Sequence, residues 1–287
     1  MTPTTMTVVY AREEPPGSYT KSLFLAGPTP RNVPGKRYVE SWRPLALNYL
    51  EQQGYDGVVF VPEDRPDSDG VTRFKGDYID QVEWEETCLH LADVIVFWLP
   101  RDTDLPGYTT NDEWGYWKDS GKVVFGAPDD ALKVKYQQHY ADKLHVPSAR
   151  SCTELLDVAI AKLGAGSMRT GGEREVPLYI WNTPHFQSWY NNLRMAGNRL
   201  DHARVEWVFL VGPERNRVFI WSMHVDIWVE SEQRSKTNEV VLSRPDISTV
   251  VLYRRAACIE QSLVVLVREF RSPVSNSLGF VVELPGG

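Results

Sequence analysis

The chain has 287 residues, 42% of them hydrophobic, and a formal net charge of −7 at pH 7. This length can form two domains of ordinary size with a core for each. Lysine and arginine form no block anywhere in the sequence, which argues against a protein that binds a nucleic-acid backbone. Small molecules are therefore the expected partners.

The three cysteines, Cys88, Cys152 and Cys258, lie far apart and show neither a CxxC motif nor a Cys/His spacing. A disulfide framework or a zinc site is therefore not expected, and a reducing, cytoplasmic setting fits best. The first residues lack a basic segment followed by an apolar one, and no apolar run approaches the ~18 residues of a membrane span. The sequence predicts neither export nor a membrane anchor.

The first part of the chain alternates short apolar runs with helix-compatible segments. Mostly apolar runs of strand length are typical of strands that are covered on both faces. Their alternation with helices predicts an α/β fold with a parallel sheet and right-handed crossovers. Strands are predicted at 21–26, 57–61, 94–99 and 122–125, and helices at 41–53, 80–91, 111–119 and 151–163.

Ligands of such a sheet bind beyond the carboxyl ends of its strands. This rule selects the loops after Ala26, Val61 and Leu99, which are rich in glycine, proline, aspartate and arginine. We expect the binding pocket at these loops.

A glycine-rich segment follows the last of these helices and has the composition of a linker. We predict a first domain over 1–164, a linker over 165–175 and a second domain over 176–287. The second domain reads as a mixed or antiparallel α+β domain. Its predicted elements are a helix at 186–200 and strands at 205–211, 218–230, 247–253, 263–270 and 280–284.

Glu113 lies in the segment TTNDEWGYW, after the third predicted strand. Thr110, Asn111 or Asp112 can cap the helix that begins here, and a helix N-terminus stabilises an ionised carboxylate. Gly115 would let a ligand approach closely. Such a carboxylate can attack an anomeric carbon or stabilise an oxocarbenium-like centre. The alternative is a helix-start charge beside aromatic residues that pack in the core.

A second acid is needed to handle the proton of a leaving group. The preceding helix contains QVEWEE, in which Glu83, Glu85 and Glu86 point in different directions, so only one is expected to face the pocket. Trp84 in the same segment is either a core residue or a platform on which a base stacks.

Three stretches resemble the nucleoside 2-deoxyribosyltransferase superfamily, which includes related nucleotide N-glycoside hydrolases. They are LFLAGPTPR at 23–31, QVEWEETCLHLADVIVFWLP at 81–100 and GYTTNDEWGYWKDSGKVVF at 107–125. The resemblance covers roughly the first 165 residues, and the two strand contexts make it more specific than its E-x-G element alone.

In that family the glutamate of an E-x-G motif after the third strand is the nucleophile that receives the deoxyribosyl group. The matching residue is Glu113, followed by Trp114 and Gly115. A family acid lies eight residues before the aspartate that opens the third strand, and counting back from Asp93 gives Glu85. The resemblance implies a flavodoxin- or Rossmann-like parallel sheet, chemistry without a cofactor, and a homo-oligomer in which a neighbouring subunit helps to close the site.

The sequence departs from the family pattern at a position that bears on whether the glycosyl group is transferred or hydrolysed. Transferases of this family usually carry another aspartate six residues before the nucleophile, at the position of Gly107. Asp102 or Asp104 can substitute from the same loop. The departure favours hydrolysis or an unusual substrate.

The resemblance also implies a set of substrate contacts. The turn AGPTPR would line the pocket with backbone and an arginine, and arginines in pocket-side loops suit a phosphate on the substrate. Solvated loop arginines are the alternative. The predicted substrate-binding residues are Gly27, Pro28, Arg31, Trp84, Arg101, Asp102 and Gly115.

The end of the chain, 246–287, resembles the entry to a Nudix hydrolase domain of the ADP-ribose pyrophosphatase type. In that family an E-L-P-G-G-like strand end leads into a box whose glutamates hold Mg²⁺. This sequence stops at Gly287, so no metal site is predicted, and Mg²⁺ would matter only in a longer chain with a complete box. The resemblance implies an incomplete Nudix-like domain.

We expect an enzyme that cleaves or transfers at the N-glycosidic bond of a nucleoside or nucleotide. Glu113 and Glu85 are its catalytic residues. The alternatives are a module that senses a nucleotide or an ADP-ribose derivative without turnover, and a Nudix hydrolase that works only in a longer form of the chain. A pure sensor does not need both acids.

Overall fold

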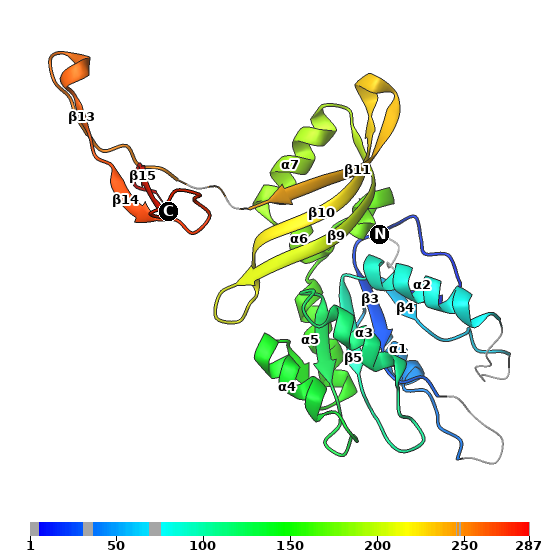
Figure 1. Cartoon of the computed structure of the whole chain (residues 1–287). Coiled ribbons are helices and arrows are strands. Elements are labelled where there is room, and N and C mark those ends of the chain that lie inside the picture. Colours follow the sequence, from blue (N-terminus) through cyan, green and yellow to red (C-terminus); the bar gives the residue numbers. More distant parts are fainter. Residues whose placement is uncertain (1–5, 31–36, 69–75, 245, 247, 287) are drawn as a thin grey trace. The chain divides into compact units, whose positions relative to one another are not determined.

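The computed structural model describes residues 6–30, 37–68, 76–244, 246 and 248–286. The chain divides into two compact units, Met1–Ser243 and Arg244–Gly287 (Figure 1). Arg31 falls outside the described residues, so its predicted role in substrate binding has no structural account. Among the described residues, no helix is both long enough and apolar enough to cross a membrane.

The first unit is built on a six-stranded sheet in which every pairing is parallel, with the order β1-β4-β3-β5-β6-β7. The predicted α/β fold is thereby confirmed for this part of the chain. The strands are β1 (Thr7–Tyr10), β3 (Ser22–Ala26), β4 (Val58–Val61), β5 (Val94–Trp98), β6 (Val123–Gly126) and β7 (Ser148–Ala149).

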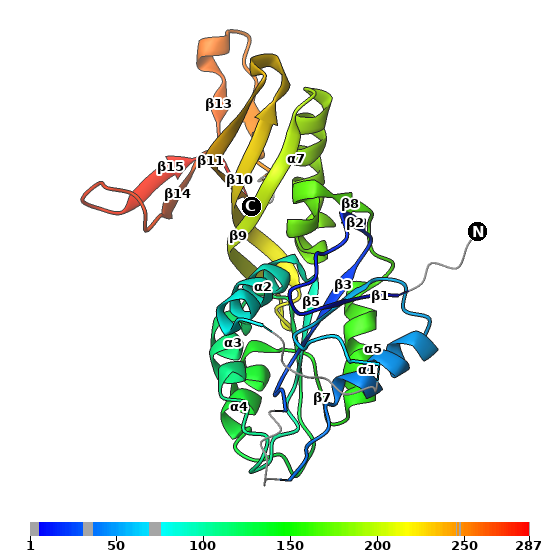
Figure 2. The ribbon, with the colours of Figure 1, turned by 90° about the vertical axis from the view of Figure 1, so that its right-hand side faces the viewer.

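Every residue of β3, β4, β5 and β6 is buried, because helices cover both faces of the sheet. Figure 2 shows α2, α3 and α4 on one side of the sheet and α1 and α5 on the other. The helices are α1 (Arg43–Gln52), α2 (Tyr78–Leu91), α3 (Thr109–Trp117), α4 (Lys135–Leu144) and α5 (Cys152–Leu163).

The predicted helix 80–91 begins two residues early, because Asp77 caps it by accepting a hydrogen bond from the Ile79 N–H at 2.7 Å. The edge strands β1 and β7 and the helix α4 were not predicted. The helix α4 is polar on average, and its buried residues are Gln137 and Ala141, so it has few of the strongly apolar residues by which the other helices were predicted.

A three-stranded antiparallel sheet, β11-β10-β9, follows in the same unit. One face of this sheet presents Trp221 and Met223, which are buried in one cluster with Phe186 and Tyr190 of α7. The predicted helix 186–200 ends at Met195 because the chain turns into β9. The elements are α6 (Leu178–Trp181), α7 (Pro184–Met195), β9 (Arg199–Val211), β10 (Arg217–Val229), η2 (Glu230–Glu232) and β11 (Arg234–Ser243).

The segment predicted as a linker, 165–175, contains β8 (Arg169–Thr170), which pairs with β2 (Ser18–Tyr19), and the 3-10 helix η1 (Gly171–Glu175). Arg169 is fully buried and forms two hydrogen bonds with the Asp93 carboxylate, at 2.8 and 2.6 Å. Asp93 opens β5, as predicted from the sequence, so a buried ion pair fastens this segment to the parallel sheet. The domain boundaries at 164 and 176 stay a prediction.

The second unit consists of two short hairpins, and none of its described residues is buried. β12 (Tyr253–Arg254) pairs with β13 (Leu263–Val264), and β14 (Val267–Phe270) pairs with β15 (Phe280–Glu283). The 3-10 helix η3 (Ile259–Gln261) joins the strands of the first hairpin. Of the strand predicted at 247–253, only Tyr253 lies in a strand, as the first residue of β12, and Thr249 forms an isolated bridge with Gly286. Position 247 is outside the described residues.

Candidate functional site

The strand order places the candidate site where β3 and β5 lie side by side. From β3 the chain crosses to β4 on one side of β3, and the later strands β5 and β6 lie on the other side. The carboxyl ends of β3 and β5 therefore form the switch point at which ligands bind in open α/β sheets. The loops after both strands meet here, since a Cβ on Gly107 would lie only 2.6 Å from Cγ of Pro28.

Gly27, the first residue after β3, can only be glycine. Its φ is +152°, and a Cβ would come within 2.2 Å of the Trp98 carbonyl oxygen at the end of β5. Gly27 and Pro28 are both buried. The backbone of this turn is therefore packed directly against the neighbouring strand end.

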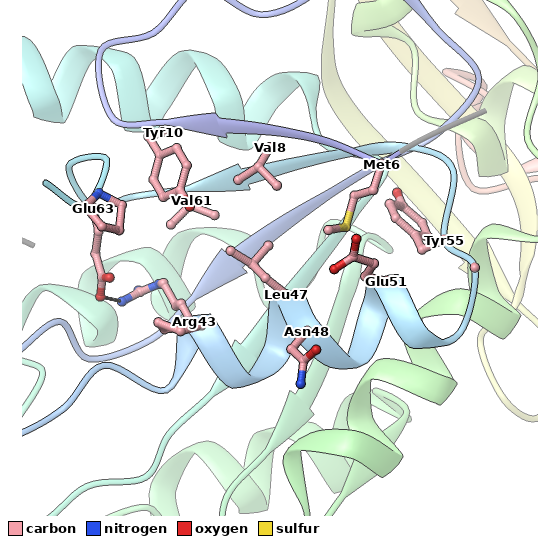
Figure 3. A pocket seen from close by; sticks show the side chains of 13 residues that line it. Met6, Val8, Tyr10, Arg43, Leu47, Asn48, Glu51, Tyr55, Val61 and Glu63 are labelled. Carbon is pink, nitrogen blue, oxygen red and sulfur yellow. Dashed lines mark hydrogen bonds and ion pairs between the residues drawn. The ribbon is translucent and has the colours of Figure 1, made fainter. Parts of the chain in front are cut away.

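Arg43, at the start of α1, holds this turn from the other side. Its guanidinium is buried and donates hydrogen bonds to the carbonyls of Leu25 at 3.0 Å and Gly27 at 2.8 Å, and to the Thr29 hydroxyl at 3.1 Å. It also forms an ion pair of 2.5 Å with Glu63, which follows β4 (Figure 3). One side chain thus fixes the loop after β3 relative to β4.

The sequence interpretation did not single out Arg43 or Glu63. Both are buried ions, at 1% and 6% exposure, and each satisfies the other. The signal that could have found them is an arginine at a helix start directly after a strand and its loop, with a glutamate just beyond the next strand. That pattern becomes informative only once β3 and β4 are known to be neighbours.

Glu113 lies on α3, partly buried, and forms no hydrogen bond or ion pair with any described residue. Burial raises the pKa of its carboxyl group to about 8, and repulsion from Glu85 adds to the increase. The positive charge of Arg43 opposes it, and Asp112 adds a smaller repulsion. Glu113 is therefore a partly buried acid with two carboxylates and one guanidinium within electrostatic reach.

The predicted cap of α3 was wrong. The residue at the N-cap position is Tyr108, and no side chain caps the helix. Asn111 instead accepts hydrogen bonds from Arg101 and Gln137, both at 2.6 Å, and Thr110 is buried. The polar residues at this helix start stabilise the loop and α4 rather than the helix end.

Glu85 is the one of the three α2 acids that is near Glu113. Its side chain is partly buried, whereas Glu83 and Glu86 are exposed. Glu85 accepts a hydrogen bond of 2.7 Å from Gln81, whose amide also donates to the Pro62 carbonyl at 3.3 Å. The two acids that the family resemblance indicated therefore lie within electrostatic reach of each other.

The aromatic residues around the two acids serve mainly the core. Trp114 is 1% exposed and packs edge-on against Phe97, with ring centroids 5.4 Å apart. The ring centroids of Trp84 and Phe24 are 6.3 Å apart, and the Trp84 indole N–H donates to the Glu13 carbonyl at 2.8 Å. Core packing, one of the two interpretations of Trp84, therefore accounts for its position.

Gly115 sits in α3 with open space where a Cβ would be, because no atom lies within 4 Å of that point. Glycine is not required there by packing or by φ. Close approach of a ligand remains the predicted reason for a residue that weakens a helix.

Arg101 and Asp102, two predicted substrate contacts, are engaged with the loop that carries them. The Arg101 guanidinium donates to the Gly107 carbonyl at 3.2 Å and to Asn111, although its buried Nε has no partner. Asp102 accepts from the backbone N–H groups of Asp104 and Leu105 and pairs with Arg37. Burial alone would raise the pKa of Asp102 slightly, but these hydrogen bonds outweigh it, and the pKa is lowered.

No cluster of three or more His, Cys, Asp or Glu side chains suited to a metal ion occurs in the described part of the chain. The charged group whose role the contacts do define is Arg43, which holds the backbone turn after β3.

A family model described as "Nucleoside 2-deoxyribosyltransferase like" matches residues 20–131. No curated protein matches the chain. Residues 20–131 are thus a nucleoside 2-deoxyribosyltransferase-like domain, which contains both Glu85 and Glu113 and ends in the loop after β6. The match indicates glycosyl transfer at nucleosides as the general class of activity.

Proposed function

We propose that the chain cleaves or transfers at the N-glycosidic bond of a nucleoside or nucleotide, with Glu113 as the nucleophile and Glu85 as the acid and base. The observation that carries the proposal is the state of Glu113, a partly buried carboxyl group with no hydrogen-bond or ion-pair partner among the described residues and with a second carboxylate within electrostatic reach. The family match over 20–131 supports the same class of chemistry.

In the first step an oxygen of Glu113 forms a bond to C1′ of the sugar while the bond from C1′ to the base nitrogen breaks. The electron pair of that bond goes to the base, and Glu85 donates the proton that the base takes up. In the second step Glu85 takes a proton from water, and the resulting oxygen nucleophile releases Glu113 by attack at C1′. With a second base in place of water, the same step is transfer.

Hydrolysis is favoured over transfer by Gly107. Its φ of +57° and its contact with Pro28 leave no room for the aspartate that transferases of this family usually carry there. The proposed substitutes, Asp102 and Asp104, both pair with Arg37 in the structure. We therefore propose water as the acceptor.

The remaining predicted contacts are part of this proposal. The backbone of Gly27 and Pro28 would line the sugar side, and Gly115 would allow close approach. Trp84, Arg101 and Asp102 would border the pocket, and Arg31 or Arg101 would meet a 5′-phosphate. The partners are small-molecule nucleosides or nucleotides. A homo-oligomer and a cytoplasmic location also remain proposals.

The test is release of free base from a panel of nucleosides and 5′-nucleotides, followed by chromatography. Glu113→Ala should abolish release while binding of the substrate persists, and Glu85→Gln should slow it at least about 100-fold, within the range of general acid catalysis. Glu83→Gln, an exposed acid on the same helix as Glu85, is the matched control and should leave the rate unchanged. Unchanged release by Glu113→Ala would refute the nucleophile.

A second candidate is a sensor that binds a nucleotide or an ADP-ribose derivative without turnover. The observation that favours it is the pKa of Glu113 near 8, because a carboxyl group that is protonated at neutral pH is a poor nucleophile. The two candidates differ at alkaline pH, where the enzyme gains activity and the sensor still releases no base.

The likeness of the second unit to the start of a Nudix domain stays a proposal. The residues that would hold Mg²⁺ in that family have no counterpart in this sequence. Adding Mg²⁺ and ADP-ribose to this chain should therefore yield no AMP, and detectable AMP would overturn that expectation.

A further inference from the structure

A cavity of about 600 Å³ lies between α1 and the edge strand β1, on the face of the sheet that α1 and α5 cover (Figure 3). It does not include Glu113, Glu85 or any other predicted site residue. Its walls are mainly apolar, and Figure 3 shows the pair of Glu63 and Arg43 at one end and Glu51 near Met6 at the other. The apolar side chains that line it are Met6, Val8, Tyr10, Leu47, Tyr55 and Val61.

The cavity exists because β1 has no helix of its own. The chain passes from β1 to β2 without a helix, and the buried residues Ala46 and Leu50 of α1 belong to the core over the inner strands. Leu47, on the flank of α1, faces the cavity instead. An apolar strip along the edge of the sheet is therefore left without a cover from the described residues.

The charged groups of the cavity offer acceptors rather than free donors, whereas Asn48 and Tyr10 in the lining can also donate. Each of the three guanidinium nitrogens of Arg43 already donates to a protein oxygen. In Glu63 one carboxylate oxygen accepts from Arg43 and from the Ser41 hydroxyl at 2.7 Å, and the other accepts from no described residue. With Glu51 at the rim, the lining has one more negative charge than positive.

We propose that this cavity binds a planar aromatic molecule that bears N–H donors on one edge, such as a nucleobase with an exocyclic amino group. The volume is that of a small-molecule site, and apolar walls with a few converging polar groups are typical of such sites. A carboxylate oxygen accepts from amino and ring N–H groups of bases, as in protein contacts with cytosine. The net negative charge of the lining favours cations and neutral molecules over anions.

The experiment measures binding by calorimetry with adenine and with three isosteric probes, the cation benzamidine, the neutral benzamide and the anion benzoate. Adenine and benzamidine should bind saturably, benzamide at least threefold more weakly than benzamidine, and benzoate not at all. Saturable binding of neither adenine nor benzamidine, or equal binding of benzoate, would overturn the proposal. Because no turnover is measured, failure here is separate from failure of the reaction at Glu113.

A pair of variants on one helix locates the binding. Leu47→Trp fills the cavity and should weaken benzamidine at least tenfold, whereas Leu45→Trp, at a position that is 74% exposed and outside the cavity, should bind like the wild type. Equal binding by both would place the probe elsewhere and refute the site. If Leu47→Trp does not fold, Glu51→Lys at the exposed rim should weaken benzamidine at least threefold, and unchanged binding would equally refute the site.

Discussion

Replacing Glu113 by glutamine should stabilise the protein relative to the wild type, and this gain in the free energy of unfolding should increase with pH. In the folded chain burial raises the pKa of Glu113 from its ordinary value of 4.5 to about 8. Between these two values the folded state binds a proton more tightly than the unfolded state does, so the free energy of unfolding falls with increasing pH. The stabilisation is complete below 4.5 and is lost by the time the pH has passed 8.

The size of the effect follows from the same two values. At about 1.4 kcal/mol per pH unit, the interval between the unfolded and folded pKa values of Glu113 corresponds to about 5 kcal/mol in the free energy of unfolding. Partial access of water to the carboxyl group makes this an upper limit. Glu113→Gln removes the titration. Relative to the wild type, the variant should therefore gain about 3 to 5 kcal/mol of stability between pH 4.5 and 8.

The assay is urea unfolding of both proteins at a series of pH values, with Glu83→Gln as the control for loss of an exposed glutamate. The stability difference between Glu113→Gln and the wild type should widen steadily with pH, whereas that of the control should stay flat. A difference that is constant from pH 4.5 to 8 would show that the carboxyl group is solvated like an ordinary glutamate and that burial does not raise its pKa.

Three further variants test the account. Gly115→Ala should raise stability by about 0.5–1 kcal/mol in thermal unfolding, because open space surrounds that position, and should lower base release if a ligand approaches there. Asp93→Asn should cost about 3–5 kcal/mol in urea unfolding, because it leaves the Arg169 guanidinium buried without its ion partner, and a loss below 1 kcal/mol would contradict that pairing. Glu63→Gln should lower the pKa of Glu113, read from carboxyl ¹³C shifts, because the neighbouring guanidinium is then less neutralised, and an increase would contradict this.

The central strands could be predicted from the sequence because the cause of burial is local. A run such as VIVFW is apolar throughout, and β5 (Val94–Trp98) is buried at every position. The strand β1 (Thr7–Tyr10) was missed because it lies at a sheet edge, where only Val9 of its four residues is buried and the pattern of a covered strand is lost. The helix α4 (Lys135–Leu144) was missed because it is polar on average and buries Gln137 and Ala141 rather than large apolar side chains.

The position of Glu113 could be found because the rule for parallel sheets links chain position to the site, whereas Glu85 was chosen among three acids only by the family resemblance. Glu113 follows β5, and Glu85 lies on the helix that precedes it. The pairing of Arg43 with Glu63 could not be found in this way, because it joins residues 20 positions apart across two neighbouring strands. Partners set by the tertiary fold leave no periodic signal in the chain.

The segment 165–175 shows the limit of composition as a guide. Its glycines are typical of a linker, yet Arg169 within it is buried against a carboxylate 76 positions away. A charged residue in a glycine-rich segment is ordinarily solvated, and only the buried position of its partner at the start of β5 reverses that expectation.

The most direct test of the role of Glu113 is mass spectrometry of the protein quenched in acid during turnover of a nucleoside that it cleaves. If Glu113 is the nucleophile, a peptide containing Glu113 should be heavier by one glycosyl group, and Glu113→Gln should give no such peptide. The nucleophilic role of Glu113 would be contradicted if the wild type released base steadily without any adduct on that peptide and Glu113→Gln released base at an undiminished rate.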